Sequence, residues 1–263
     1  MMASDSTVSS DASTNSIPAS TSLNEEEDPT SWKQKGVRAF QDRKYDESKT
    51  WFLKIVEHDY SNFPPSGNKL KFLSQAHNWL GRIYEEQYKY QEALREYSVA
   101  IDLYPSFDIP YYNRGALHVD LGNYEQALGD YAKSIELAPV TTGGWNNRGC
   151  LLKDIFKQYE KSIYDFDQAI KINPSAGHCY LHKAEAFLLL GQLETAKQEL
   201  LKAQEINKNL VLAYYVQGYM CMMEKNYSEA LKFFQKFLKH EKRYYSKIQS
   251  AKAHIKKIIL RGS

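Results

Sequence analysis

The sequence predicts an all-α protein in which pairs of helices stack into a solenoid. The first observation is a repeat of about 34 residues, a length typical of helix-pair arrays. One small residue marks the repeat, at Gly81, Gly115, Gly149, Ala184 and Gly218. The second observation is that apolar residues recur at intervals of three and four within each unit, as on one face of a helix. The third is proline at unit ends, where a helix cannot continue, at Pro105, Pro139 and Pro174.

The composition is that of an ordinary globular chain. Of its 263 residues, 43% are hydrophobic and 25% are charged, and the net charge of +2 creates no field that would favour nucleic acid. Three cysteines without CxxC spacing predict free thiols in a reducing, intracellular compartment, and we expect the cytoplasm. No apolar stretch approaches the roughly 18 residues that a membrane span needs.

Residues 1–29 differ from the rest of the chain. They are rich in Ser and Thr and end in an acidic run from Glu25 to Asp28, without the basic start or apolar run of a secretory signal. So little apolar surface cannot offset the entropy of ordering, and we expect a disordered acidic tail. The tail is either a phosphorylation or docking segment or a solvated leader.

Six helix pairs are expected after the tail. Their ranges are 30–60, 71–107, 108–141, 142–176, 177–210 and 211–242. In the third unit the apolar spacing predicts helices over 108–121 and 124–137, joined by the turn LGNY. An insertion over 61–70, where two prolines and a glycine prevent a continuous helix, separates the first two units. It is either a loop that still allows the units to stack or a hinge.

The repeated glycine calls for a packing explanation, because glycine inside a helix costs about 1 kcal/mol relative to alanine. We expect that the missing side chain lets the second helix of each pair come close. A small residue on that second helix does the same from the other side, at Ala93, Ala127, Ser162, Ala196 and Ala230. Aromatic residues four positions before the glycine fill space between helices, at Trp32, Tyr111, Trp145, Tyr180 and Tyr214.

The last segment, 243–263, is predicted to be a basic capping helix. Its apolar residues follow helical spacing, at Tyr244, Ile248, Ala251, Ile255 and Ile258. A solenoid leaves its last apolar face open, and a terminal helix with a polar outer side closes it. Beyond residue 225, lysine and arginine far outnumber the two acidic residues, Glu229 and Glu241.

The units resemble the tetratricopeptide repeat family, whose pattern is W-x2-L-G-x2-Y, then A-x3-F, then P. One unit carries this pattern as Trp145, Gly149, Ser162, Phe166 and Pro174. The resemblance is weakest at the ends, where the first unit lacks the proline and Lys208 and Lys242 replace it in the last two. It implies a right-handed α-solenoid of about six helix pairs with a capping helix, and a concave groove, lined by the first helix of each pair, that binds protein or peptide.

The resemblance also implies which side chains line the groove. They are Asn78, Arg82, Tyr112, Asn113, Asn146, Asn147, His182, Leu189, Tyr215 and Tyr219. Asn113 and Asn147 take one position in adjacent units, and asparagines there hold the backbone of an extended peptide in proteins of this family. An amide both donates and accepts, so it can pair with a peptide of any sequence. The alternative is that both asparagines are solvated and contact no ligand.

The predicted groove changes from polar to apolar toward the C terminus. The fifth and sixth units offer leucines, tyrosines and methionines, which adapt to partner side chains and anchor them. A partner helix with an apolar face could lie there. Alternatively, the capping helix folds across this end and covers those residues itself.

We find no catalytic constellation and expect neither an enzyme nor a cofactor. The chain has no phosphate-binding glycine loop, no dinucleotide-binding turn and no nucleophile elbow. His178, His182 and Glu185 share one helix face, but the H-E-x-x-H order is missing. We therefore expect a polar patch in the groove and no metal site.

The expected function is that of a protein–protein interaction adaptor or scaffold whose groove binds a peptide or helix. The alternative is a structural subunit of a larger complex, contacted by protein, RNA or membrane through the basic C-terminal region. We favour a protein partner over membrane or nucleic acid, an acidic one at the basic end, and expect no small-molecule substrate. A clamp for a chaperone's acidic tail, known in some members of the family, is incomplete here: Lys33 matches it, but Val37 and Gly143 do not.

Overall fold

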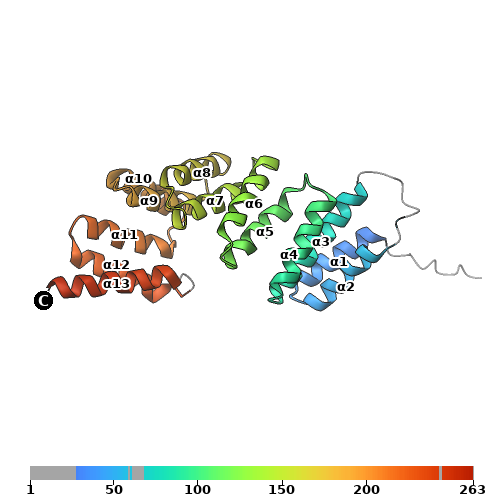
Figure 1. Ribbon diagram of the computed structural model, residues 1–263. Coiled ribbons are helices and arrows are strands. Elements are labelled where there is room, and N and C mark those ends of the chain that lie inside the picture. Colours follow the sequence, from blue (N-terminus) through green and yellow to red (C-terminus); the bar gives the residue numbers. More distant parts are fainter. Residues whose placement is uncertain (1–27, 59, 61–67, 243–244, 263) are drawn as a thin grey trace, which may run out of the picture.

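The computed structural model describes residues 28–58, 60, 68–242 and 245–262, and the regular structure in these ranges is entirely helical. The helices are α1 (Pro29–Gln41), α2 (Tyr45–Glu57), α3 (Asn68–Glu86), α4 (Tyr90–Leu103), α5 (Asp108–Asp120), α6 (Tyr124–Leu137), α7 (Thr142–Asp154), α8 (Tyr159–Ile172), α9 (Gly177–Leu189), α10 (Leu193–Ile206), α11 (Val211–Met223), α12 (Tyr227–His240) and α13 (Tyr245–Gly262). They follow one another along an elongated array, with α1 and α2 at one end and α12 and α13 at the other (Figure 1). The predicted all-α solenoid is confirmed.

Two expected boundaries move. α1 begins at Pro29, which suits a first helical turn because the N–H it lacks would be unpaired there, and Asp28 caps the helix by accepting from Ser31 N at 2.7 Å. These two residues therefore belong to the helix start and not to the expected tail. α3 begins at Asn68, so the last three residues of the expected insertion are helical, as no proline or glycine interrupts NKL. Residues 1–27 and 61–67 lie outside the described residues.

Each helix pair is joined by a turn with one residue in the left-handed conformation. In the described chain these residues are Arg43, Tyr88, Gly122, Lys157, Gly191 and Lys225, each with a positive φ. All of them lie two residues before the second helix of the pair. Only two are glycine, although other residues lose roughly 1–2 kcal/mol in this conformation. The turn is therefore maintained by the packing of the two helices and not by its own residue preference.

The two helices of a pair pack closely at the repeated glycine. A Cβ atom on Gly149 would lie 2.7 Å from the Phe166 ring, and one on Gly81 would lie 2.5 Å from the Tyr97 ring. The same aromatic position faces the other repeated glycines, in the pairs Gly36 and Phe52, Gly115 and Tyr131, and Gly218 and Phe234. The expected packing role of the glycine is confirmed, and the space it leaves is filled by an aromatic ring of the second helix.

Two arginines next to the repeated glycines tie the helices of a pair together. Arg114 donates to both carboxylate oxygens of Asp130 at 2.8 Å, and Arg148 does the same to Asp165. The carboxylates are nearly buried, with side chains 9% and 1% exposed. A two-point pair of this kind sets both the distance and the orientation of the two helices.

α13 closes the C-terminal end of the array, where it lies along α12 (Figure 1). Its Ala251 and Ile258 are buried in one apolar cluster with Val216, Phe234 and Phe237 of the last pair. It therefore covers apolar surface that the last pair would otherwise expose to water. None of the described helices has the length and apolarity needed to cross a membrane.

Candidate functional site

Side chains on the first helices of neighbouring pairs bond to one another in a row. Asn113 of α5 donates to Asn78 Oδ1 of α3 at 2.9 Å, and Asn147 of α7 donates to the Tyr112 hydroxyl of α5 at 3.0 Å. Asn146 of α7 donates to Asn147 Oδ1 at 3.1 Å. We call these five residues the polar ladder. It brings together half of the residues that the sequence predicts for the groove.

Two further bonds join first helices on either side, and the second of them reaches the polar ladder itself. Lys33 of α1 donates to Gln75 of α3 at 2.6 Å, and the Cys179 thiol of α9 donates to Asn146 Oδ1 at 3.4 Å. Within the ladder Asn78 is only 5% exposed, whereas Asn113 and its other members are half-buried. Asn78 is therefore buried between the helices and joins α3 to α5, whereas the half-buried amides are partly accessible at the surface.

Arg82, another predicted groove residue, lies against two aromatic rings. Its guanidinium carbon is 4.3 Å from the centroid of the Trp79 ring and 4.7 Å from that of Phe40. These contacts hold the planar group by cation–π attraction, while the edge of the plane still carries N–H donors. Arg82 is thus positioned by residues of the chain itself.

The predicted apolar groove residues meet the terminal helix. Leu189, Tyr215 and Tyr219 line a cavity of about 230 Å³, and Ser250 and His254 of α13 line its other side. Tyr215 Oη and Ser250 Oγ share a hydrogen bond of 3.0 Å. Of the two alternatives for this end of the groove, the structure therefore has the capping helix covering it.

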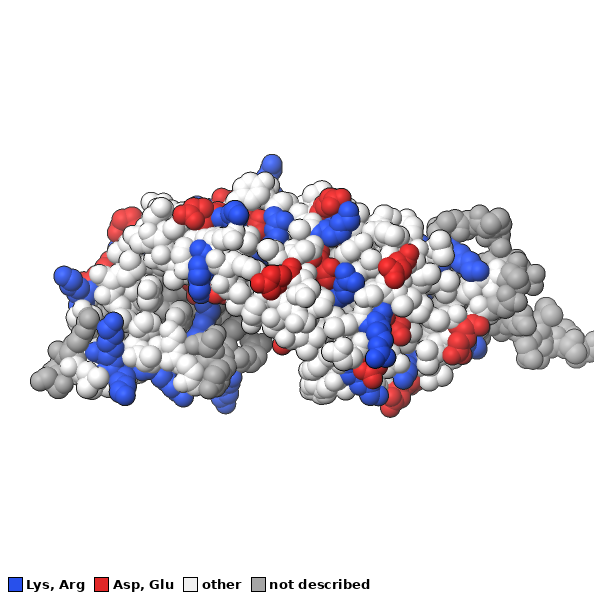
Figure 2. All heavy atoms as spheres, viewed as in Figure 1, with Lys and Arg blue, Asp and Glu red and all other residues white. Residues whose placement is uncertain are grey.

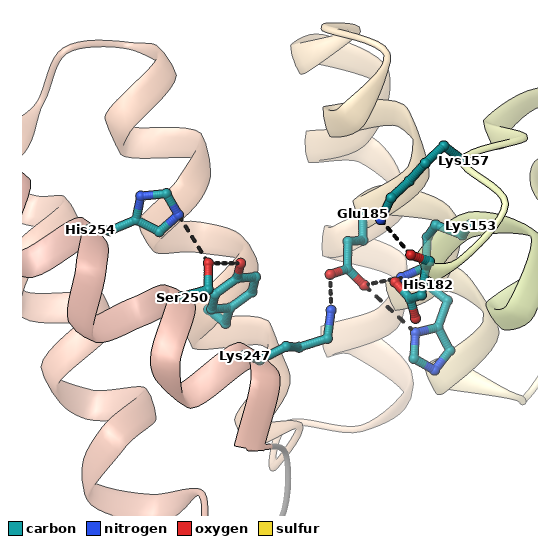
Figure 3. Close-up of polar contacts among 9 residues, drawn as sticks. Lys153, Lys157, His182, Glu185, Lys247, Ser250 and His254 are labelled. Carbon is teal, nitrogen blue, oxygen red and sulfur yellow. Dashed lines mark hydrogen bonds and ion pairs between the residues drawn. The ribbon is translucent and has the colours of Figure 1, made fainter. Parts of the chain in front are cut away.

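An ion network beside this cavity was not anticipated from the sequence. The side chain of Lys153 on α7 is fully buried, and its Nζ lies 2.6 Å from Glu185 Oε2 on α9 and 2.7 Å from Asp154 Oδ1. Lys247 of α13 bonds to the other carboxylate oxygen of Glu185 (Figure 3). Three helices that are distant in the sequence thus meet at one carboxylate.

The charges in this network stabilise one another. Burial by itself would raise the pKa of Glu185, but Lys153 and Lys247 outweigh it and hold the pKa well below its usual range. Burial would likewise lower the pKa of Lys153, whereas the carboxylates of Glu185 and Asp154 raise it. Glu185 and Lys153 therefore stay charged near neutral pH.

His182, also predicted for the groove, lies at the edge of this network. Its ring stacks on Phe166 with centroids 5.8 Å apart, and its Nδ1 is 4.0 Å from Glu185 Oε2. Burial would lower the pKa of His182, but Cys150 and Glu185 raise it to about 9. Within the described ranges, no group of three or more His, Cys, Asp and Glu residues is arranged to hold a metal ion.

Exposed basic side chains gather over α12 and α13, at the lower left of Figure 2. They are Lys232, Lys236 and Lys239 of α12, Lys242 just after it, and Lys252, Lys256 and Lys257 of α13. Lys232 is neutralised by Glu229 at 2.6 Å. On the rest of the visible face, acidic and basic side chains are interspersed.

Models of the tetratricopeptide repeat match three segments of the chain, residues 74–107, 109–139 and 177–210. Two of these segments contain residues of the polar ladder, and the third contains Glu185 and His182. The curated proteins contain no match to the chain.

Several solved structures share the fold. MamA of Desulfovibrio magneticus RS-1 has a TM-score of 0.56 at 19% identity, covering 63% of this chain and 93% of that chain. YrrB, described as a TPR protein with an unusual peptide-binding site, has a TM-score of 0.56 at 17% identity, covering 76% and 97%. The APC/C hetero-tetramer Cut9–Hcn1 matches with a TM-score of 0.62 at 16% identity, covering 89% of this chain and 43% of that chain. At such identities the likeness concerns the fold alone.

Proposed function

The chain is a tetratricopeptide repeat protein, and on that premise we propose that it is a non-catalytic adaptor or scaffold. Its ligand would be an extended peptide held along α3, α5 and α7. We further propose that the helix pairs from α1 with α2 to α11 with α12 are six repeat units and that α13 is their cap. The free cysteines Cys150, Cys179 and Cys221 are in keeping with a reducing compartment such as the cytoplasm.

The polar ladder is the observation that carries this proposal. Asn113 and Asn147 occupy one position in successive pairs, and each is already oriented by a bond to the preceding first helix. Each of these bonds uses a single N–H, and each amide has a second N–H and a carbonyl oxygen as well. The oxygen of Asn147 already accepts one bond, from Asn146, and has a second lone pair. Amides fixed in this way can pair with the peptide groups of a ligand with little further loss of side-chain entropy.

The fold neighbours support the same mode of action. YrrB is a TPR protein with a peptide-binding site, although it shares only 17% identity with this chain. Cut9 is part of a multi-subunit assembly. A solenoid presents one continuous concave surface along which an extended partner can lie. Binding of this kind needs no catalytic group.

Replacing Asn113 and Asn147 together by alanine tests the proposal. Peptides are first selected from a random display library on the wild-type chain, and their affinities are then measured by fluorescence anisotropy. Since each amide–backbone bond contributes about 0.5–1.5 kcal/mol, we expect the double variant to bind roughly tenfold more weakly or worse.

The matched control replaces Gln126 and Gln198, two exposed amides on second helices, by alanine. This control should bind like the wild type, and circular dichroism should show equal helicity for all three proteins. Unchanged affinity of the asparagine variant for every selected peptide would show that the polar ladder only joins the helices.

The exposed lysines of α12 and α13 favour a second candidate, a subunit held in a larger assembly through an acidic partner. Binding through this surface would weaken steeply with added salt, since exposed charges are screened over about 10 Å at 0.1 M salt. Binding through the polar ladder would change little over the same salt range. A salt titration of any purified complex therefore separates the two candidates.

A further inference from the structure

We propose that α13 is a built-in ligand of the C-terminal groove, and that a partner helix carrying a lysine can take its place at Glu185. This inference goes beyond the adaptor function proposed above, because it concerns α9 and α11 and does not depend on the asparagines of α5 and α7. The kind of partner follows from the contacts that α13 makes.

The carboxylate of Glu185 faces in two directions. Its Oε2 accepts from the buried Lys153, a bond between two first helices of the array, at 2.6 Å. Its Oε1 accepts from Lys247, which reaches across from α13 (Figure 3). The first contact is independent of α13, so the second oxygen is the one that a lysine from any helix in the groove would meet.

The surroundings of Lys247 define a site for an ammonium group. The Lys247 Nζ lies 5.2 Å from the centroid of the Tyr215 ring, within the range of cation–π attraction. The hydroxyl of Tyr215 bonds to Ser250, which is three residues further along α13 and thus on the same face. His254 follows one turn later, with its ring stacked on Phe234 at 5.3 Å. The groove therefore recognises a helix with a lysine, a hydroxyl three residues later and a flat ring seven residues later.

α13 does not fill the groove. A cavity of about 230 Å³ remains between Ser250 and His254 on one side and Leu188, Val216 and Tyr219 on the other. The cavity is partly open to solvent, so its apolar lining residues face water there and lack contacts with other side chains. A partner helix with a larger apolar side chain near the position of Ser250 would gain these contacts.

α13 lies at the end of the array and buries fewer apolar side chains than α12, the helix beside it. Among its residues whose burial is described, only Ala251 and Ile258 are buried. The preceding helix, α12, buries Ala230, Phe234 and Phe237, all at 0% exposure. Segments with few buried apolar contacts open at lower free energy than the core. α13 can therefore leave the groove while the helix pairs remain folded.

The test uses full-length protein and a fluorescein-labelled synthetic peptide with the sequence of residues 245–262. In the wild type the resident helix competes with the peptide, so the apparent affinity is reduced by the fraction of molecules whose groove is open. Lys247→Ala in the protein weakens the resident helix and should tighten peptide binding by about tenfold. Lys252→Ala, which removes an exposed lysine from α13, is the matched control and should bind like the wild type.

A second peptide, in which the lysine at 247 is alanine, tests the role of Glu185. The Lys247→Ala protein should bind this peptide about tenfold more weakly than the unaltered one, the size of effect expected for a charge-assisted bond. Adding Glu185→Gln to the protein should remove the difference between the two peptides. Equal binding of both peptides by Lys247→Ala protein would overturn the proposal, as would equal binding of the unaltered peptide by Lys247→Ala and wild-type protein.

A measurement on the wild type guards against misfolding of the variants. Amide exchange of the ¹⁵N-labelled chain is followed by NMR with and without excess unlabelled peptide. Displacement predicts faster exchange in the chain's own α13, with α9 and α11 unchanged or slower. Unchanged exchange in α13 at saturating peptide contradicts displacement. None of these outcomes depends on Asn113 or Asn147, so failure here leaves the proposed function standing.

Discussion

Individual glycines and rings show how one repeat position depends on another. In the five pairs with glycine on the first helix, an aromatic ring of the second helix lies directly against it. In the fifth pair alanine replaces the glycine at Ala184, and the ring position is taken by Leu200. Both residues are buried. The methyl group of alanine needs space that a flat ring would occupy, so the two positions change together.

Gly149→Ala should destabilise the protein by about 1–3 kcal/mol, because its Cβ would overlap the fully buried Phe166. Gly129→Ala is the control: this helical glycine is exposed, and a Cβ added there would meet no atom of a neighbouring helix within 4 Å. It should stabilise by roughly 0.5–1 kcal/mol through its helix preference. Urea unfolding measures both effects, and an equal change at the two sites would contradict the close-packing account.

The two helices of a pair are joined by charged side chains to which the sequence alone assigns no role. The arginine in each of the stretches YYNRG and WNNRG bonds to a carboxylate on the second helix, and Lys183 with Glu199 at 3.1 Å repeats the contact in the fifth pair. The asparagine just before each arginine bonds to the preceding first helix. Each five-residue stretch therefore makes one contact within its own helix pair, through the arginine, and one with the preceding pair, through the asparagine.

Asp165→Asn should lower the free energy of unfolding by roughly 3 kcal/mol, since it leaves Arg148 beside a buried group that no longer carries charge. The control is Lys133→Gln, which removes a partner from the exposed pair with Glu136. Exposed pairs contribute about 0–1 kcal/mol, so this change should be small. Thermal unfolding of the two variants measures the shift in Tm that each causes. Similar shifts would argue against a structural role for the buried pair.

Across the whole molecule, Glu185 connects the repeat array to α13. The carboxylate is held between Lys153 and Lys247, contacts that span 32 and 62 positions of sequence. Because the pKa of folded Glu185 lies well below its usual value, its ionised form stabilises the folded state. That stability is present above about pH 4.5, the ordinary pKa of a glutamate, and is lost as the pH falls through the folded pKa.

Glu185→Gln should therefore cost about 3 kcal/mol at pH 7, because the buried Lys153 loses one of its two carboxylate partners. The difference from the wild type should shrink as the pH falls below about 4.5. The raised pKa of His182 adds stability that is fully present only below about pH 6.5, so part of the change between pH 7 and pH 5 comes from this histidine. Urea unfolding at pH 7, 5, 4 and 3 measures the difference, with the exposed Glu194→Gln as control. A difference that is constant with pH would mean that the pKa of Glu185 is the same in the folded and unfolded proteins.

The repeat period alone determined the architecture, because the same few residue positions make the same helix–helix contacts in every unit. Glycine, the facing ring and the small residue are set by contacts within about 34 positions, and such contacts leave a periodic trace in the sequence. The positions of Asn113 and Asn147 followed from the same period, although their bonds to Asn78 and Tyr112 did not.

Only the tertiary structure decided which helix occupies the C-terminal groove and which charges meet there. Lys153 follows the apolar pair LL in α7, and nothing local distinguishes it from an exposed lysine. Its burial depends on how α9 stacks on α7, and the approach of Lys247 depends on where α13 folds back. These contacts occur once in the molecule and therefore leave no periodic pattern, so the repeat that predicts the solenoid could not predict the occupant of its groove.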